Sequence, residues 1–119
     1  PLSLAITYGD VTLVNQLIAA GADVRAANPS GFTPMMFAVT KAELAVLDDL
    51  IARGASVDQA NQAGLTPLML VASSGRDEIA KKLLAAGARR DAHDAQGRTA
   101  MVIAQQSGHE ALASLLRVE

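Results

Sequence analysis

The stretch Leu65–Leu70, LTPLML, places a Thr-Pro pair directly before an apolar run, and Phe32–Phe37 repeats the arrangement as FTPMMF. Threonine favours the N-cap position of a helix because its hydroxyl accepts a free backbone N–H of the first turn. Proline favours the first helical position, where a missing N–H costs nothing. Each of the two stretches therefore predicts the start of a short helix.

The two stretches belong to an internal repeat of 33 residues. Pro34 and Pro67 are one period apart, and a further period leads to Ala100 in the related run RTAMVIA. Other features recur in the same register: Gly-Ala at Gly21, Gly54 and Gly87, apolar pairs starting at Leu17, Leu50 and Leu83, glycines at Gly31, Gly64 and Gly97, and Asn28, Asn61 and Asp94 three residues before those glycines. A shared period of this length indicates stacked supersecondary units.

Each period predicts a helix, a turn, a second helix and a polar hairpin. The first helix is expected to run to about Thr40 or Ser73. Acidic residues favour the positive end of a helix dipole, and glycine favours a left-handed helix end. The predicted landmarks are the caps Thr33, Thr66 and Thr99, the turns Gly9, Gly75 and Gly108, the acidic starts Asp10, Asp77-Glu78 and Glu110, and the ends Gly21, Gly54 and Gly87.

Neither helix of a period buries its apolar face alone, so stacking of the periods has to supply the core. The predicted fold is all-α, an α-solenoid of stacked helix-turn-helix repeats with projecting hairpin loops. We expect a single domain over residues 1–119, divided into repeat 1 (about 1–27), repeat 2 (28–60), repeat 3 (61–93) and repeat 4 (94–119).

Composition agrees with close-packed helices and narrows the function classes. Half of the 119 residues are hydrophobic but only 3% are aromatic, and the formal net charge is −2. The small negative charge gives no general attraction to nucleic acid or anionic lipid. The chain has no cysteine, which excludes disulfides, thiolate nucleophiles and Cys-based metal sites. No apolar run approaches the ~18 residues of a membrane span.

The repeat resembles the ankyrin repeat family. The residues that carry the resemblance are GFTPMMFA, GLTPLMLVA and GRTAMVIA for the first helix, and GADV, GASV and GARR for the following loop. The resemblance covers nearly the whole chain. It implies L-shaped helix pairs with projecting hairpins, stacked into a slightly curved solenoid, and a function in protein binding through the hairpin tips and the exposed side of the first helices.

The sequence departs from the family pattern at several positions. The family usually has His two residues after the Pro, where this chain has Ser3, Met36, Met69 and Val102. The inter-repeat polar link is therefore lost in every repeat, and apolar filling replaces it in the last three. We expect a looser stack because Met is adaptable. Ala42 stands where the other repeats have Gly, so we expect a reshaped turn with Lys41 and Glu43 displaced.

The two ends of the sequence differ. Arg117 replaces the second apolar residue of the recurring pair, which predicts a C-terminal capping repeat. The first repeat lacks its cap and hairpin, so we expect partly exposed apolar residues at Leu2, Leu4, Leu13 and Leu17. Either upstream residues were trimmed, or another segment covers this end in a longer chain. A signal peptide removed before Pro1 would place the protein in the periplasm; otherwise the cytoplasm is favoured. The Ala-rich, Cys-free composition suggests a bacterial source.

No arrangement of residues indicates catalysis or a cofactor. His93 lies beside Asp91 and Asp94 but has no nucleophile placed by spacing, and we expect a solvated hairpin tip. His109 is expected to be structural. Three side chains on one hairpin make a poor metal cage, and the basic residues Lys81-Lys82 and Arg89-Arg90 have no aromatic partners for nucleic acid. We therefore expect no enzyme activity, metal, cofactor, nucleic-acid or membrane partner.

The resemblance places candidate partner-binding residues on the hairpins and at the ends of the first helices. Phe32, Leu65 and Arg98 occupy the same slot between the loop Gly and the cap Thr, and are expected to form an apolar stripe with Arg98 at its edge, or else to pack on neighbouring hairpins. Tyr8 is a candidate anchor because amphipathic rings are common hot spots. The full candidate set is Tyr8, Pro29, Ser30, Phe32, Lys41, Gln62, Leu65, Ser74, His93, Gln96, Arg98 and Gln106.

Two function classes remain open from the sequence. The first is a monomeric, non-catalytic scaffold that binds a partner protein of unknown identity through the hairpin tips and the concave face of the first helices. The second is a structural stacking segment of a larger chain, with the apolar surface around Leu2, Leu4 and Leu13 covered by a missing part.

Overall fold

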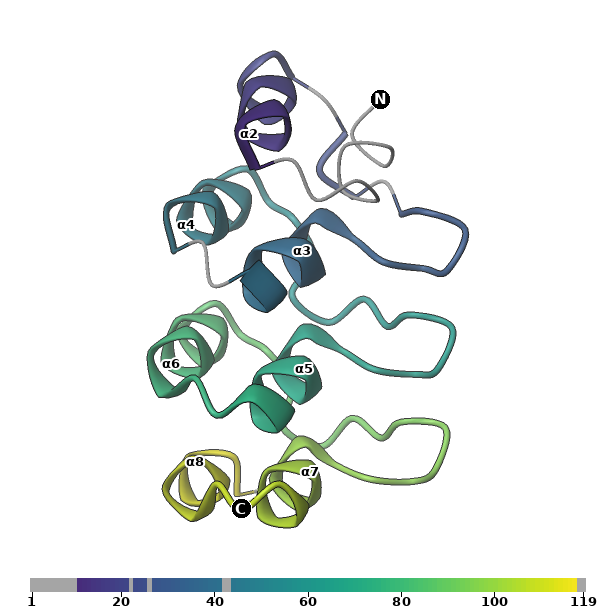
Figure 1. Cartoon of the computed structure of the whole chain (residues 1–119), viewed down its shortest axis with the longest axis vertical. Helices are drawn as coiled ribbons and strands as arrows, with labels where there is room; N and C mark the ends of the chain where they lie inside the picture. Colours follow the sequence, from purple (N-terminus) through teal and green to yellow (C-terminus); the bar gives the residue numbers. More distant parts are fainter. Residues whose placement is uncertain (1–10, 22, 26, 42–43, 118–119) are drawn as a thin grey trace. The chain divides into compact units, whose positions relative to one another are not determined.

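The computed structural model describes residues 11–21, 23–25, 27–41 and 44–117, and helices are the regular structure found in this part of the chain (Figure 1). The helices are α2 (Val11–Ala19), α3 (Pro34–Lys41), α4 (Leu44–Ala52), α5 (Pro67–Ser74), α6 (Asp77–Ala85), α7 (Ala100–Gln106) and α8 (Glu110–Leu115). The all-α, helix-turn-helix prediction is confirmed. Some predictions fall on residues that the structure does not describe, namely Leu2, Ser3, Leu4, Gly9, Asp10, Ala42 and Glu43.

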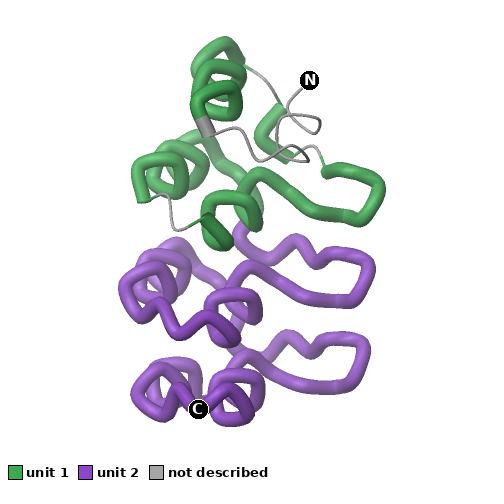
Figure 2. The backbone as a smooth tube through the Cα atoms, in the orientation of Figure 1, with its two compact units in different colours: residues 1–56 green, residues 57–119 purple. Residues whose placement is uncertain are grey.

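The chain divides into two compact units, Pro1–Ser56 (unit 1) and Val57–Glu119 (unit 2) (Figure 2). In unit 2, α5 packs on α6 and α7 packs on α8, and the two pairs stack through contacts of α5 with α7 and of α6 with α8. In unit 1, α3 packs on α4. The organisation of residues 1–119 as one domain stays a prediction.

The first helices begin where the sequence predicts, because the cap hydroxyls accept the expected hydrogen bonds. Oγ1 of Thr66 accepts from the N–H of Met69 at 3.4 Å, and Oγ1 of Thr99 accepts from the N–H of Val102 at the same distance. Thr33 makes the equivalent bond at 3.2 Å. α3 and α5 each end one residue beyond the predicted Thr40 and Ser73.

The second helices end two residues before the predicted glycines, at Ala19, Ala52 and Ala85. Gly87 has a φ of +93°, and its N–H donates to the Leu84 carbonyl while the N–H of Ala88 donates to the Leu83 carbonyl. These two bonds form a Schellman motif, which satisfies carbonyls that the helix leaves free. Glycine is needed at the left-handed position because a Cβ there is strained.

The core consists of aliphatic and Met side chains, as the composition predicts. Met36 and Met69, which stand at the family's His position, are 0% and 1% exposed. Val102 is half-buried. Among the large apolar residues of the described part, Leu13 (40% exposed) and Leu44 (36%) are the exposed ones. Every buried side-chain nitrogen and oxygen in the described residues has a hydrogen-bond partner, as is usual in native proteins.

Candidate functional site

Three hairpins are closed by the recurring Asn or Asp residue, and we name them the Asn28 (residues 27–33), Asn61 (60–66) and Asp94 (93–99) hairpins. In the Asn61 hairpin, the side-chain Oδ1 accepts hydrogen bonds from the N–H groups of Ala63 (2.9 Å) and Leu65 (3.0 Å). The other two hairpins contain the same pair of bonds. The 33-residue spacing identified Asn28, Asn61 and Asp94, but it did not indicate that their side chains accept backbone hydrogen bonds.

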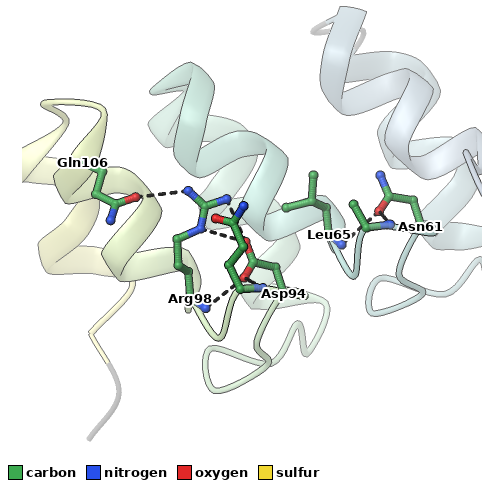
Figure 3. A network of polar contacts seen from close by, with 7 residues as sticks. Asn61, Leu65, Asp94, Arg98 and Gln106 are labelled. Atoms are coloured by element: carbon green, nitrogen blue, oxygen red, sulfur yellow. Dashed lines mark hydrogen bonds and ion pairs between the residues drawn. The ribbon is translucent and has the colours of Figure 1, made fainter.

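The Asp94 hairpin adds an ion pair to this arrangement (Figure 3). The Asp94 side chain is 2% exposed, and its Oδ2 accepts from Nε of Arg98 at 2.9 Å and lies 2.9 Å from Nη2 of the same guanidinium. Nη1 of Arg98 donates to Oε1 of Gln106 at 3.1 Å. Arg98 therefore ties the hairpin to the end of α7. A carboxylate allows this because it has a second acceptor oxygen, which Asn28 and Asn61 lack.

The environment of Asp94 favours its charged form. The pKa of the Asp94 carboxyl is lowered first by the hydrogen bond from the backbone N–H of Arg98, and then by the Arg98 guanidinium and the N–H of Gln96, while burial acts in the opposite direction. On the surface, Arg89 lowers the pKa of Asp91 through a side-chain hydrogen bond. Neighbouring donors therefore favour the ionised form of both carboxylates, Asp91 and Asp94.

We expect the Asp94 carboxylate to contribute stability that is lost in acid. The Asp94→Asn variant should lack this contribution. Because the folded pKa of Asp94 lies below the unfolded value of about 3.9, its stabilising contribution is complete above that pH and is lost as the pH falls through the folded pKa. Asn keeps the Oδ1 acceptor but not the charge. Thermal melts at pH values from 7 to 2 should show the wild type more stable than the variant at neutral pH and a shrinking difference below about pH 4.

The Asp91 contribution is present in both proteins and cancels in this comparison. A difference between wild type and Asp94→Asn that stays constant down to pH 2 would contradict the assignment to Asp94.

Several of the predicted site residues come together in unit 2. A hollow of about 100 Å³ is lined by Ala63, Leu65, Asp94, Ala95, Gln96 and Arg98. The two hairpins that form it are joined by a backbone hydrogen bond of 3.0 Å from the N–H of Ala95 to the Ala63 carbonyl. Of the candidate set, Leu65, Gln96 and Arg98 line this hollow. Gln106 is bonded to Arg98 (Figure 3).

The remaining candidates are placed separately. In unit 1, Pro29, Ser30 and Lys41 are exposed and Phe32 is half-buried. In unit 2, Gln62, Ser74 and His93 are exposed, and Oγ of Ser74 donates to the Val71 carbonyl of its own helix. Tyr8 lies outside the described residues. The role of all of these residues in binding stays a prediction.

Links between the ends of the second helices were not predicted from the sequence. In unit 1, Nη2 of Arg25 donates to the Gly54 carbonyl at 3.0 Å. In unit 2, the N–H of Arg89 donates to Oδ1 of Asp58 at 2.9 Å, and Nε of Arg90 donates to the Leu115 carbonyl at 3.2 Å. Arg90 thus satisfies a carbonyl in the last turn of α8, where a cation is favourable.

His109, which the sequence predicts to be structural, packs its ring over the turn at Gly75. A Cβ added to Gly75 would lie 2.6 Å from the ring carbon Cε1. A second, wide hollow of about 550 Å³ lies in unit 1 against Gly21, Asp23, Val24, Arg25 and Arg53.

Within the described part of the chain, no group of three or more His, Asp or Glu side chains is placed to hold a metal ion, and no helix could cross a membrane.

The family model for ankyrin repeats (3 copies) matches residues 40–119, which is more than half of the chain. The chain belongs to the ankyrin repeat family. No curated protein matches its sequence. The match contains α4 to α8 and therefore the Asn61 and Asp94 hairpins with their shared hollow. Ankyrin repeats generally mediate protein–protein interaction and typically form non-catalytic scaffolds.

Proposed function

We propose that this ankyrin repeat protein is a non-catalytic, monomeric scaffold that recognises a partner protein through its hairpins and the exposed ends of its first helices. The carrying observation is that hydrogen bonds close the Asn61 and Asp94 hairpins and join them to each other, while Leu65, Gln96 and Arg98 line one hollow on them. A surface fixed before binding loses little conformational entropy when the partner docks, which favours affinity.

The charges near the hollow favour a protein partner over nucleic acid. The Arg98 guanidinium is paired with Asp94, and Arg89 contacts both oxygens of Asp91 at 3.1 and 3.2 Å. Phosphate binding depends on cations that are available to displace counterions, and these two arginines already have carboxylate partners.

Site-specific photo-crosslinking tests this proposal. A benzophenone amino acid is placed at Gln96, at Ser30 or, as a control, at exposed Glu78 on α6, and each protein is irradiated in extract of the source organism. We expect one discrete protein adduct from the two hairpin positions and none from Glu78, because the partner contacts the hairpins. Mass spectrometry identifies the adduct, and the purified partner should reproduce it. Equal capture from all three positions would contradict the proposed surface.

A structural stacking segment is the second candidate, and Leu13 favours it because this large apolar side chain on α2 is 40% exposed. The same experiment separates the two functions when a fourth benzophenone is placed at Leu13. Capture from Leu13 with no capture from Gln96 and Ser30 would support stacking against another domain.

A further inference from the structure

The hollow between the Asn61 and Asp94 hairpins has walls of a particular chemistry. Ala63, Leu65 and Ala95 contribute apolar groups, while Asp94 and Arg98 contribute charges that neutralise each other at 2.9 Å. The edges of the Arg98 guanidinium are engaged by Asp94 and Gln106. A guanidinium in this state is weakly hydrated and offers its flat face for packing. The hollow therefore presents a mainly apolar and electrically neutral surface.

The size of the hollow restricts the side chain that it accepts. Its volume is about 100 Å³, whereas a closed cavity that holds a benzene ring measures about 150 Å³. A Val-, Leu- or Met-sized side chain therefore suits the hollow better than an aromatic ring. A charged side chain in the hollow would lose its hydration, and it would find a partner only by displacing Asp94 or Arg98 from their ion pair.

A polar group stands at the rim of this hollow. The Gln96 side chain is exposed, and its amide makes no hydrogen bond within the part of the chain that the structure describes. A primary amide carries both donors and an acceptor, so it matches the N–H and C=O groups that an extended peptide leaves free.

We propose, building on the protein-binding function above, that this hollow takes one short aliphatic side chain from an extended, locally uncharged segment of the partner protein. The Gln96 amide hydrogen-bonds the backbone beside that side chain. Leu65 and the Arg98 face form the two walls, and the Asp94–Arg98 ion pair excludes acidic and basic residues from the same position.

A peptide-display selection tests this inference without knowledge of the partner. The probe is a phage library of random nine-residue peptides, selected in parallel against the wild-type protein, against Ala95→Leu, which fills the hollow, and against Ala85→Leu. Ala95 and Ala85 are both exposed, and Ala85 does not line the hollow, so Ala85→Leu controls for the added side chain. Thermal melts confirm that each variant is folded.

We expect the peptides enriched on the wild type to share one position restricted to Val, Leu, Ile or Met, flanked by uncharged residues. Their enrichment should fall about tenfold on Ala95→Leu, as expected for the loss of one or two buried methylene groups, and should be unchanged on Ala85→Leu. Gln96→Ala should weaken the same peptides.

Enrichment of acidic, basic or aromatic residues at the shared position, or no enrichment that depends on Ala95, would overturn the inference. The result is separable from the proposed function. Crosslinking from Gln96 without aliphatic peptides would reject only the chemistry of the hollow, and aliphatic peptides without a crosslinked partner would reject only the function.

Discussion

Gly64→Ala should lower the free energy of unfolding by about 3 kcal/mol. Gly64 has a φ of +80°, where an Ala costs about 1 kcal/mol. A Cβ at this position would also lie 2.9 Å from the backbone nitrogen of Ala95 and 3.2 Å from the Cα of Asp94. Because these neighbours are backbone atoms, the Asp94 hairpin has to move. The Ala95–Ala63 hydrogen bond then weakens, at a further cost of about 1 kcal/mol, and strain from overpacking adds about another.

Gly97→Ala is the matched control for this prediction. Gly97 occupies the equivalent position of the Asp94 hairpin with a φ of +78°, but an added Cβ would have no neighbour within 4 Å. We therefore expect a loss of only about 1 kcal/mol from the backbone strain. Urea unfolding followed by circular dichroism measures both variants, and equal losses would show that close contact between the hairpins contributes nothing to stability.

Leu83→Ala should cost about 3 kcal/mol of folding free energy, within the range known for buried Leu-to-Ala changes. Leu83 is 0% exposed, and its helix α6 packs against α5 and α8. Truncation removes apolar contacts and leaves a cavity that a close-packed helical stack fills only partly. The midpoint of urea unfolding should fall accordingly, and the Asn61–Asp94 hairpin region should lose protection from hydrogen exchange together with the helices.

The adjacent Leu84 provides the control, because it has the same side chain in the same helix but is half-buried. Leu84→Ala should cost about 1 kcal/mol, since less apolar surface returns to water. If Leu84→Ala lost as much stability as Leu83→Ala, the assignment of the Leu83 face of α6 to the core would be wrong.

The local features could be predicted from the sequence because they depend on neighbours in the chain. Thr66 caps α5 and Gly87 ends α6 through bonds that span three to five residues, and the chemistry of these residue types is enough to forecast them. The order of helices, turns and hairpins follows in the same way from the 33-residue period. Helix bounds were displaced by one or two residues, since cap geometry decides them.

Part of the candidate site could also be predicted from the sequence. The slot shared by Phe32, Leu65 and Arg98 identified Leu65 and Arg98 as neighbours on successive hairpins, and both line the same hollow. The sequence placed Arg98 at the edge of an apolar stripe for a partner, and its role in binding stays a prediction. The structure adds that its guanidinium is paired with Asp94 and Gln106, because the carboxylate that closes this hairpin has a second oxygen to offer.

The sequence by itself determined the repeat register and the places where each helix begins and turns, since these follow from capping chemistry and from apolar residues recurring every 33 positions. Its motifs also carried the resemblance to the ankyrin repeat family. Only the tertiary structure decided which polar groups meet across repeats: Arg90 with the end of α8, Ala95 with Ala63, and the walls of the small hollow. These contacts depend on the distance and angle between stacked repeats, which are set by how the core side chains pack and not by any residue's preference for its own neighbours.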